Sequence, residues 1–278
     1  MINIILLVGL GLASYFFGNI NWAIIISKLK KQDIRKMGSG NPGTLNMSRN
    51  LGLKLGLLTF LLDILKGVIP AVVAYFVFKG RGYFDNTEFV IADFAPYMCG
   101  LFAVLGHIFP VIFKFKGGKG IATTIGVFIA CESMHGWEWS MVVIMALVAA
   151  LIFIYLTEFG AMGSFIAITP PAIGGSIRLF LLYGSEEKIA TCLAFYIVTN
   201  MIIFAICFFT WFAHRKNIKR MLEGDEHPTS IKEMVVKMKA KKAAERAEAL
   251  AKAQFDENAN NENMPSKNSV EKEETPKN

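Results

Sequence analysis

The sequence predicts an all-helical protein that crosses a membrane seven times, and its composition and charge pattern support that prediction. Of its 278 residues, 54% are hydrophobic and 12% are aromatic, and the mean hydropathy is +0.44. A chain this apolar is typical of multi-span membrane proteins. Lys and Arg gather in short segments between apolar stretches, as they do in cytoplasmic loops. The net charge of +7 therefore indicates membrane lipid as a partner, and no nucleic acid.

The cysteines and the N-terminus fit the same class. All four thiols lie in or beside apolar stretches and form no CxxC pair, so we expect buried core residues without a metal or disulfide role. They are Cys99, Cys131, Cys192 and Cys207. The N-terminus has neither the basic region nor the cleavage site of a signal peptide, which predicts an uncleaved first span.

The first apolar stretch, residues 2–27, is nearly uncharged and long enough to cross about 30 Å of hydrocarbon. A run of cations follows it: Lys28, Lys30, Lys31, Arg35 and Lys36. Positive charge marks the cytoplasmic end of a span, so the N-terminus is expected outside. The further apolar stretches are residues 55–78, 94–113, 121–134, 137–156, 161–183 and 189–213.

The stretch 121–134 is short for a full span, and the charges decide how it is interpreted. Basic clusters follow both 94–113 and 189–213, and both are expected in the cytoplasm. An even number of crossings must then separate them. Three long stretches lie between, so the short one must cross as well. Seven spans, with the N-terminus outside and the C-terminus in the cytoplasm, satisfy the charges.

The later part of the chain adds three expectations. Pro170, Pro171, Gly174 and Gly175 should interrupt and kink the sixth span, and Arg178 should extend to the outer interface. The membrane domain is expected to cover residues 1–227. Residues 228–254 should form a charged cytoplasmic helix, and residues 255–278 a disordered tail.

Three polar segments share the cytoplasmic face in this topology, and the first is GSGNPGTLNMSRN at residues 38–50. It combines short hydrogen-bond donors with Arg49. Arginine binds phosphate bidentately, while small polar groups and glycine amides reach the remaining oxygens. The segment contains G-x-G-x-x-G, but that dinucleotide fingerprint needs a preceding strand. Here a membrane span precedes it and Pro42 interrupts it, which excludes a dinucleotide site.

The second polar segment, KFKGGKGIAT at residues 114–123, predicts a loop that holds phosphate. Glycines allow the backbone to approach a ligand closely. Successive N–H groups can form an anion-binding concavity, and a following helix adds its positive end. It is no P-loop, because Lys114 stands where the first glycine belongs and Gly120 replaces Ser or Thr. A plain basic turn is the alternative, which explains the lysines but not the glycines.

The third segment, HRKNIKR at residues 214–220, adds cations and a histidine that could carry a proton. Alone, it is more typical of a basic cluster beside a membrane. Asp63 and His107 lie about two turns inside their spans, where ionisable groups are functional candidates. For Asp63 we favour a structural role, because Lys66 lies one turn away. For His107 both roles stay open.

Together these segments resemble the family of membrane acyl-phosphate:glycerol-3-phosphate acyltransferases, which make lysophosphatidic acid in bacteria. The matching segments are SGNPG…N…R at 39–49, DILKG at 63–67, GHIFPVIFKFKGGKGIAT at 106–123 and HRKNIKR at 214–220. The resemblance covers residues 1 to about 225. It implies a seven-helix fold in the bacterial inner membrane, a cytoplasmic active site, and acyl phosphate as donor instead of acyl-CoA or acyl carrier protein.

The resemblance also implies roles for individual residues. The catalytic candidates are Ser39, Arg49, Lys119 and His214, and the substrate-binding candidates are Asn41, Asn46, His107, Gly117, Gly118, Gly120 and Asn217. Thr44-Leu45 replaces the usual Ala-Thr before Asn46, so which hydroxyl contacts substrate stays open. No pattern indicates a metal or another cofactor. The expected partners are acyl phosphate, glycerol 3-phosphate and membrane lipid, with a soluble enzyme that forms acyl phosphate as a further candidate.

The resulting hypothesis is acyl transfer, in which the primary hydroxyl of glycerol 3-phosphate attacks the acyl-phosphate carbonyl. His214 could be a general base or a phosphate ligand. The main alternative is a transporter of an anionic phosphorylated metabolite, which also uses basic residues and broken helices. Against a transporter, the polar residues crowd one face and do not line a midplane path. Another alternative is a membrane scaffold whose basic tail recruits a soluble partner.

Overall fold

The computed structural model describes residues 2–80, 91–225 and 229–262. The chain divides into two units, Met1–Met234 and Val235–Asn278. The first unit holds all the predicted spans and all the candidate site residues. The second contains most of one long helix and is considered by itself.

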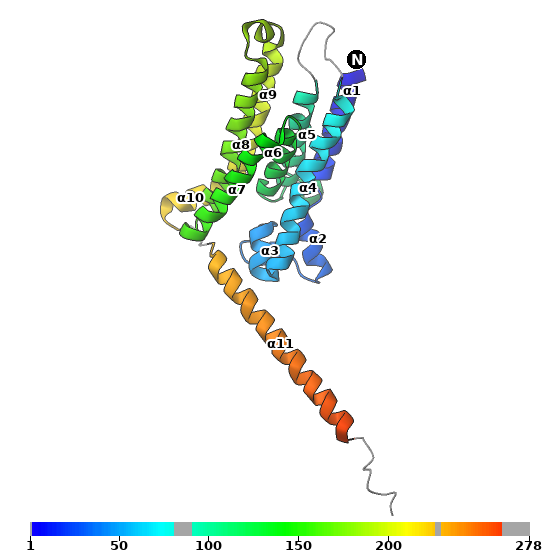
Figure 1. Cartoon of the computed structure of the whole chain (residues 1–278), viewed down its shortest axis with the longest axis vertical. Coiled ribbons are helices and arrows are strands. Elements are labelled where there is room, and N and C mark those ends of the chain that lie inside the picture. Colours follow the sequence, from blue (N-terminus) through cyan, green and yellow to red (C-terminus); the bar gives the residue numbers. More distant parts are fainter. Residues whose placement is uncertain (1, 81–90, 226–228, 263–278) are drawn as a thin grey trace, which may run out of the picture. The chain divides into compact units, whose positions relative to one another are not determined.

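The regular secondary structure of the described residues is helical, with no strand among them, which confirms the predicted all-helical class. The helices are α1 (Ile2–Gly18), α2 (Trp22–Leu29), η1 (Ile34–Lys36), α3 (Thr44–Leu51), α4 (Leu53–Phe78), α5 (Ile91–Ile108), η2 (Val111–Phe113), α6 (Ile121–Ser133), α7 (Trp137–Thr157), α8 (Gly160–Tyr183), α9 (Glu186–Ala213), α10 (Arg215–Glu223) and α11 (Ile231–Glu262). Figure 1 shows α1, α4, α5 and α6 in one group of the first unit and α7, α8 and α9 in another.

Six segments of the described chain are long and apolar enough to cross a membrane: Ile2–Leu29, Leu53–Phe78, Ile91–Phe113, Trp137–Thr157, Gly160–Tyr183 and Cys192–Ala213. They coincide with the six long predicted stretches to within a few residues. The seventh stretch is helix α6, which has only 13 residues. Its crossing, and with it the count of seven, stays a prediction.

The first span is broken, which its hydropathy does not indicate. Helix α1 ends at Gly18 and α2 begins at Trp22. Asn21 starts the second helix, because its Oδ1 accepts the Ile24 N–H at 3.0 Å, the usual role of an N-cap residue. The carbonyl of Ile20, freed by the break, accepts from the Lys66 ammonium of α4 at 2.7 Å.

Glycines bring helix backbones into direct contact at two places. A Cβ added to Gly18 would lie 2.2 Å from the Ala103 carbonyl oxygen, so α1 packs on α5 without intervening side chains. A Cβ on Gly126 would lie 2.1 Å from the Ile64 carbonyl oxygen, and α6 packs on α4 in the same way. Small residues allow such close approach between membrane helices. These contacts fix the ends of α5 and α6, which carry the glycine-rich loop between them.

Two predictions about α8 are wrong. The helix continues through Pro170 and Pro171 without the expected interruption. Arg178 does not extend to an interface, since its side chain is only 2% exposed. Its Nε lies 3.0 Å from Glu132 Oε2 on α6, and its Nη2 donates to the Tyr97 hydroxyl at 3.2 Å. A buried charge needs a partner, and Glu132 provides it.

The chain after α9 is helical in two pieces. Helix α10 covers most of the third polar segment, and α11 runs to Glu262. The predicted charged helix, 228–254, therefore lies largely within α11. The predicted tail, 255–278, overlaps the helix up to residue 262, and its remainder lies outside the described residues, as does residue 227, where the membrane domain was expected to end. The four cysteines are buried, as expected, and their thiols are free.

Candidate active site

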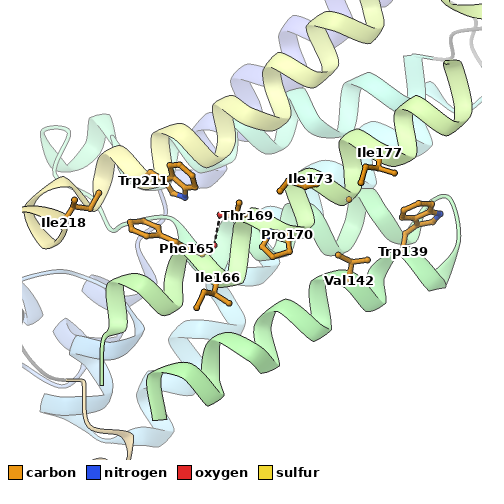
Figure 2. A pocket seen from close by; sticks show the side chains of 11 residues that line it. Trp139, Val142, Phe165, Ile166, Thr169, Pro170, Ile173, Ile177, Trp211 and Ile218 are labelled. Carbon is orange, nitrogen blue, oxygen red and sulfur yellow. Dashed lines mark hydrogen bonds between the residues drawn. The ribbon is translucent and has the colours of Figure 1, made fainter. Parts of the chain in front are cut away.

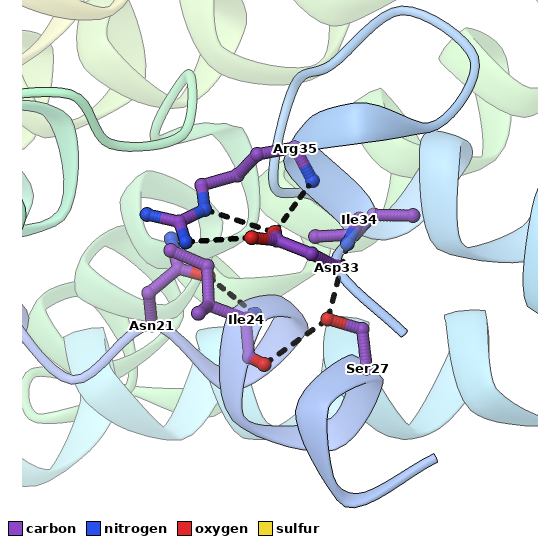
Figure 3. Close-up of polar contacts among 6 residues, drawn as sticks. All are labelled: Asn21, Ile24, Ser27, Asp33, Ile34 and Arg35. Atoms are coloured by element: carbon purple, nitrogen blue, oxygen red, sulfur yellow. Dashed lines mark hydrogen bonds and ion pairs between the residues drawn. The ribbon is translucent and has the colours of Figure 1, made fainter. Parts of the chain in front are cut away.

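A fixed turn leads from the first span into the first polar segment. Figure 3 shows Ser27 between two backbone groups: its Oγ donates to the Ile24 carbonyl at 3.0 Å and accepts the Ile34 N–H at 3.2 Å. Asp33 begins η1 by accepting the Arg35 N–H at 3.1 Å, and the Arg35 guanidinium pairs with it at 2.7 Å. That side-chain hydrogen bond lowers the pKa of Asp33 to about 2. The carboxylate thus stays charged and holds the turn at neutral pH.

Asn46 shapes the first polar segment. Its Nδ2 donates to the carbonyls of Ile34 and Met37 at 3.2 and 3.0 Å, and its Oδ1 accepts the Ser39 N–H at 3.2 Å. The side chain is 2% exposed. Its amide is therefore used to close the loop that presents the exposed Ser39, which is a different use from the predicted substrate contact.

Helix α3, largely within the first polar segment, carries Arg49. Its Nη2 donates to Thr229 Oγ1 at 2.6 Å, and Thr229 in turn donates its N–H to the Glu158 carbonyl at 2.8 Å. Ser48 packs against α4 at Gly56, where an added Cβ would lie 1.8 Å from Ser48 Oγ. Arg49 thus links the first polar segment to the residues that follow α10.

The glycine-rich loop folds back on the end of α5. Gly117 and Gly118 donate their N–H groups to the carbonyls of Ile108 and His107 at 3.2 and 3.1 Å. A Cβ on Gly117 would lie 2.0 Å from the His107 carbonyl oxygen. A Cβ on Gly118 would lie 2.2 Å from His107 Nε2 and 3.1 Å from the Pro42 carbonyl oxygen. Glycine is required here by close packing, and the packing brings the first two polar segments together.

These bonds change the expected form of the anion site. The two glycine N–H groups were expected to point at an anion, but they are already bonded to carbonyls. Gly120 has a φ of +86° and directly precedes α6, a left-handed conformation that favours glycine. The first turn of a helix leaves N–H groups without helical partners and carries partial positive charge. Lys119 and the start of α6 are therefore the candidate donors for an anion in this loop, and α6 is the following helix that the sequence predicted.

Lys119 joins the second polar segment to the third. Its Nζ donates to Asn217 Oδ1 on α10 at 2.6 Å. The N–H of Asn217 in turn donates to the carbonyl of His214, between α9 and α10, at 2.8 Å, and the Lys119 charge acts on the His214 imidazole. Three of the predicted site residues, from segments about 95 residues apart in the sequence, thus lie together.

His214 is neutral and its proton has a defined position. Nδ1 lies 2.9 Å from the Thr210 carbonyl oxygen, which can only accept, so Nδ1 carries the hydrogen and Nε2 is left as the basic nitrogen. Burial lowers the pKa of His214 from 6.5 to about 4, and the Lys119 ammonium acts in the same direction, against the bond to Thr210. An imidazole in this state can accept a proton at neutral pH.

An apolar cavity of about 760 Å³ begins beside His214. It is lined by Trp139, Val142, Phe165, Ile166, Thr169, Pro170, Ile173, Gly174, Ile177, Trp211 and Ile218, which come from α7 to α10 (Figure 2). The Phe165 ring lies 5.6 Å from the His214 ring and 5.5 Å from the Trp211 ring, between centroids. Along α8 the lining extends from Phe165 to Ile177, a rise of about 18 Å. A long apolar surface therefore adjoins a polar, basic one.

The structure brings most of the predicted residues to one end of the first unit, in two linked groups. One joins Lys119, Asn217 and His214, and the other joins His107, Gly117 and Gly118 to the Pro42 carbonyl. Asn41 lies in the same loop as Pro42, where its amide nitrogen would be 3.0 Å from a Cβ on Gly43. Prediction from sequence missed Thr210 and Thr229, because both lie outside the three polar segments whose residues, His214 and Arg49, they contact.

The fold and these residues define an integral membrane protein whose basic, glycine-rich site adjoins an apolar cavity. The family model for glycerol-3-phosphate acyltransferase matches residues 8–224, and the chain belongs to this family. The predicted family is thereby confirmed.

Relatives and solved structures agree with this assignment. Glycerol-3-phosphate acyltransferase of Finegoldia magna is 36% identical over 225 residues, which cover 81% of this chain and 96% of the relative. The enzyme of Mycoplasmopsis pulmonis is 37% identical over 218 residues, with coverages of 77% and 89%. Crystal structures of PlsY (YgiH), an integral membrane glycerol 3-phosphate acyltransferase, are similar at 30% identity. Its glycerol 3-phosphate form has a TM-score of 0.62 and covers 82% of this chain and 98% of its own. Its lysophosphatidic acid form has a TM-score of 0.61, with coverages of 83% and 98%.

Proposed function

We propose that this acyltransferase moves a fatty acyl group from acyl phosphate to the primary hydroxyl of glycerol 3-phosphate. The products are lysophosphatidic acid and inorganic phosphate. One observation carries the proposal: a neutral His214 with a basic Nε2 stands beside Lys119, between a basic loop region and an apolar cavity. That arrangement suits a substrate with a phosphoryl head and an acyl chain.

The proposed topology places this site at the cytoplasmic face of a bacterial inner membrane. The basic segments after the first span, before α6 and after α9 would then share one side, as the distribution of Lys and Arg favours. This requires α6 to cross, which gives seven spans with the N-terminus outside and the C-terminus in the cytoplasm. A soluble enzyme that forms acyl phosphate could then deliver the donor from the same side.

Two phosphoryl groups must be bound at once, and the cations divide between them. Lys119 and the first turn of α6 would hold one phosphate, with Asn217 orienting the ammonium through its 2.6 Å bond. Arg49 and Ser39, on the segment shaped by Asn46, would hold the other, with Asn41 beside them. Charge-assisted hydrogen bonds of this kind are strong and directional. Holding both reactants in line supplies much of the acceleration.

The transfer step follows from the state of His214. The glycerol 3-phosphate hydroxyl oxygen bonds to the acyl carbonyl carbon, and the bond from that carbon to the phosphate oxygen breaks. The electron pair leaves with inorganic phosphate, and the hydroxyl proton moves to Nε2 of His214. The pKa of about 4 leaves this nitrogen unprotonated before the reaction, and nearby phosphate charge would favour its protonation during it. Lys119 would stabilise the developing negative charge.

The apolar cavity would hold the acyl chain. Its lining of about 18 Å along α8 exceeds half of the roughly 30 Å hydrocarbon thickness. Phe165 and Trp211 separate it from His214, so a chain lying in it has its carbonyl end toward the basic site.

The proposal is tested by phosphate release from purified protein in detergent or vesicles. Acyl phosphate with glycerol 3-phosphate should give inorganic phosphate and lysophosphatidic acid in equal amounts, and omission of either substrate should abolish both. Replacing the donor with acyl-CoA or acyl carrier protein should leave no product. Equal turnover with acyl-CoA would contradict the proposed donor, and phosphate transport without transfer would favour the transporter.

A matched pair of lysines provides the control for this assay. Lys119→Met removes the cation bonded to Asn217, whereas Lys116→Met removes an exposed cation from the same loop. We expect the first to lose at least about 100-fold in kcat/KM, as for other preorganised charges at a reacting centre. The second should stay within about twofold, as for an exposed charge. Equal effects of the two would contradict a specific role for Lys119.

A further inference from the structure

A buried polar cluster lies beneath the glycine-rich loop and is used by no step above. Lys66 of α4 is 1% exposed. Its Nζ lies 2.7 Å from the Ile20 carbonyl oxygen, 2.9 Å from Asp63 Oδ1 and 2.8 Å from His107 Nδ1. Helix α4 thus contacts both the break of the first span and the end of α5 through one side chain.

The bonding partners of Lys66 define the state of His107. An ammonium has three donors and no acceptor, and here three acceptors lie within 2.9 Å of it, with the Gly18 carbonyl oxygen farther away at 3.5 Å. Nδ1 of His107 must then accept, so the proton of the neutral ring lies on Nε2. The Asp63 carboxylate cannot set this proton directly, because it lies 3.8 Å from Nδ1.

The protonated nitrogen faces the site. A Cβ on Gly118 would lie 2.2 Å from His107 Nε2 and 3.1 Å from the Pro42 carbonyl oxygen. Nε2 therefore points at the place where the first two polar segments meet, directly before Lys119. His214 shows the opposite arrangement, since the Thr210 carbonyl holds its proton on Nδ1. One histidine presents an acceptor and the other a donor.

We propose that Lys66 is a positioning residue, which holds the Nε2–H of His107 as a fixed hydrogen-bond donor toward a phosphoryl group bound at the glycine-rich loop. This inference rests on the proposed function, which places a phosphoryl group there. Asp63 and the Ile20 carbonyl keep the ammonium in place. Burying charged groups inside a membrane costs free energy. In this proposal the buried cluster serves substrate binding as well as helix packing.

The competing explanation is a purely structural ion pair. Asp63 and Lys66 lie one turn apart on α4, and such a buried pair can simply join helices. In that case His107 would serve only to accept the third Lys66 hydrogen, through Nδ1. The two explanations therefore assign importance to different nitrogens of one ring.

Two substitutions of His107 separate the nitrogens. In His107→Gln the side-chain amide nitrogen can reach the position of Nε2 and keep a donor there. In His107→Asn the shorter amide can reach only the position of Nδ1 and accept from Lys66. If Nε2–H is the functional group, Gln should retain kcat/KM for glycerol 3-phosphate within about fivefold, and Asn should lose roughly 10- to 100-fold, as expected for a lost hydrogen bond to a charged group.

The two His107 variants are also compared by their binding of inorganic phosphate, a measurement that needs no turnover. Inorganic phosphate should raise the melting temperature of wild type and His107→Gln, and raise that of His107→Asn much less. Asn equal to or better than Gln in both assays would overturn the inference. A wild-type protein that binds phosphate but transfers no acyl group would overturn the proposed function alone, since the order of the two variants would still test the donor.

Lys66 itself is tested against another lysine of the same helix. Lys66→Met keeps an unbranched side chain that ends at the position of Cε and removes all three donors, and Lys54→Met changes an exposed residue of α4. We expect Lys66→Met to raise the KM for glycerol 3-phosphate about tenfold in the protein that remains folded, with Lys54→Met unchanged. A loss of folded protein with normal KM in the remainder would show a structural role only and overturn the positioning role.

Discussion

His214 and His107 show how their immediate partners give two histidines of one site different chemistry. A carbonyl oxygen fixes the proton of His214 on Nδ1, whereas an ammonium fixes that of His107 on Nε2. The sequence left both histidines open between roles. The deciding partners, Thr210 and Lys66, lie inside spans that pattern analysis treats as apolar helix.

The proposed base is tested by His214→Gln. Gln can still hydrogen-bond a phosphate but cannot accept the hydroxyl proton. General-base catalysis is worth about 10² to 10⁴-fold, so we expect kcat to fall by at least about 100-fold with the KM for both substrates within a few-fold. The measurement is steady-state phosphate release, with the melting temperature as a control for folding. A raised KM with nearly normal kcat would identify His214 as a phosphate ligand.

The lowered pKa of His214 also predicts a pH dependence of stability. The folded protein binds a proton at this site only near pH 4, whereas the unfolded chain binds it near pH 6.5. The buried neutral imidazole therefore makes its full contribution to the free energy of unfolding above pH 6.5, and this contribution is lost as the pH falls toward 4. A difference of that size corresponds to about 3 kcal/mol. His214→Gln should flatten this part of a melting-temperature profile, and an unchanged profile would contradict the buried neutral imidazole.

At the scale of helices, close backbone contacts determine where the loops of the site begin. Gly126 lets α6 pack on α4, and Gly18 lets α1 pack on α5. Glycines in apolar stretches suggest such contacts from sequence, but they do not tell which helices meet. The break before Trp22 was missed for a related reason. The N-cap residue Asn21 is a weak local sign of it, and the group that satisfies the freed Ile20 carbonyl comes from α4.

The contact between α4 and α6 gives a prediction about Gly126→Ala. The new Cβ would lie 2.1 Å from the Ile64 carbonyl oxygen, so the two helices must separate. Overpacking of this kind typically costs about 1–3 kcal/mol. We expect a lower melting temperature and a weaker phosphate site, because α6 begins directly after Gly120. Gly9→Ala on α1 is the control, since no atom lies within 4 Å of its added Cβ.

A melting temperature of Gly126→Ala equal to that of Gly9→Ala would contradict the close packing of α4 and α6. A lower melting temperature with a normal substrate KM would instead show that the packing of α4 and α6 stabilises the protein without affecting substrate binding. The two measurements together thus locate the effect in the helix pair or in the loop that it carries.

At the scale of the molecule, hydropathy and charge predicted the helical class and every long apolar helix, because both depend on local composition. Motifs predicted the glycine-rich loop, Lys119 and the third segment as one site. What local patterns could not supply was pairing across the fold. Arg178 was expected at an interface and instead meets Glu132. The role of the Asn46 amide in closing a loop was not predicted, and its contact with substrate stays a prediction.

The two units of the chain lead to a prediction about its C-terminal part. The family model ends at residue 224, and the site residues and their partners up to Thr229 lie in the unit Met1–Met234. A chain ending after Met234 keeps all of them and removes residues 235–278. We therefore expect its kcat and both KM values to stay within about twofold of the full chain, in the same vesicles. Arg49→Ala in the shortened chain should still be inactive, since Arg49 would bind phosphate with charge-assisted bonds. Loss of transfer from a folded shortened chain would contradict this division and restore the hypothesis that the basic C-terminal helix acts by recruiting a partner.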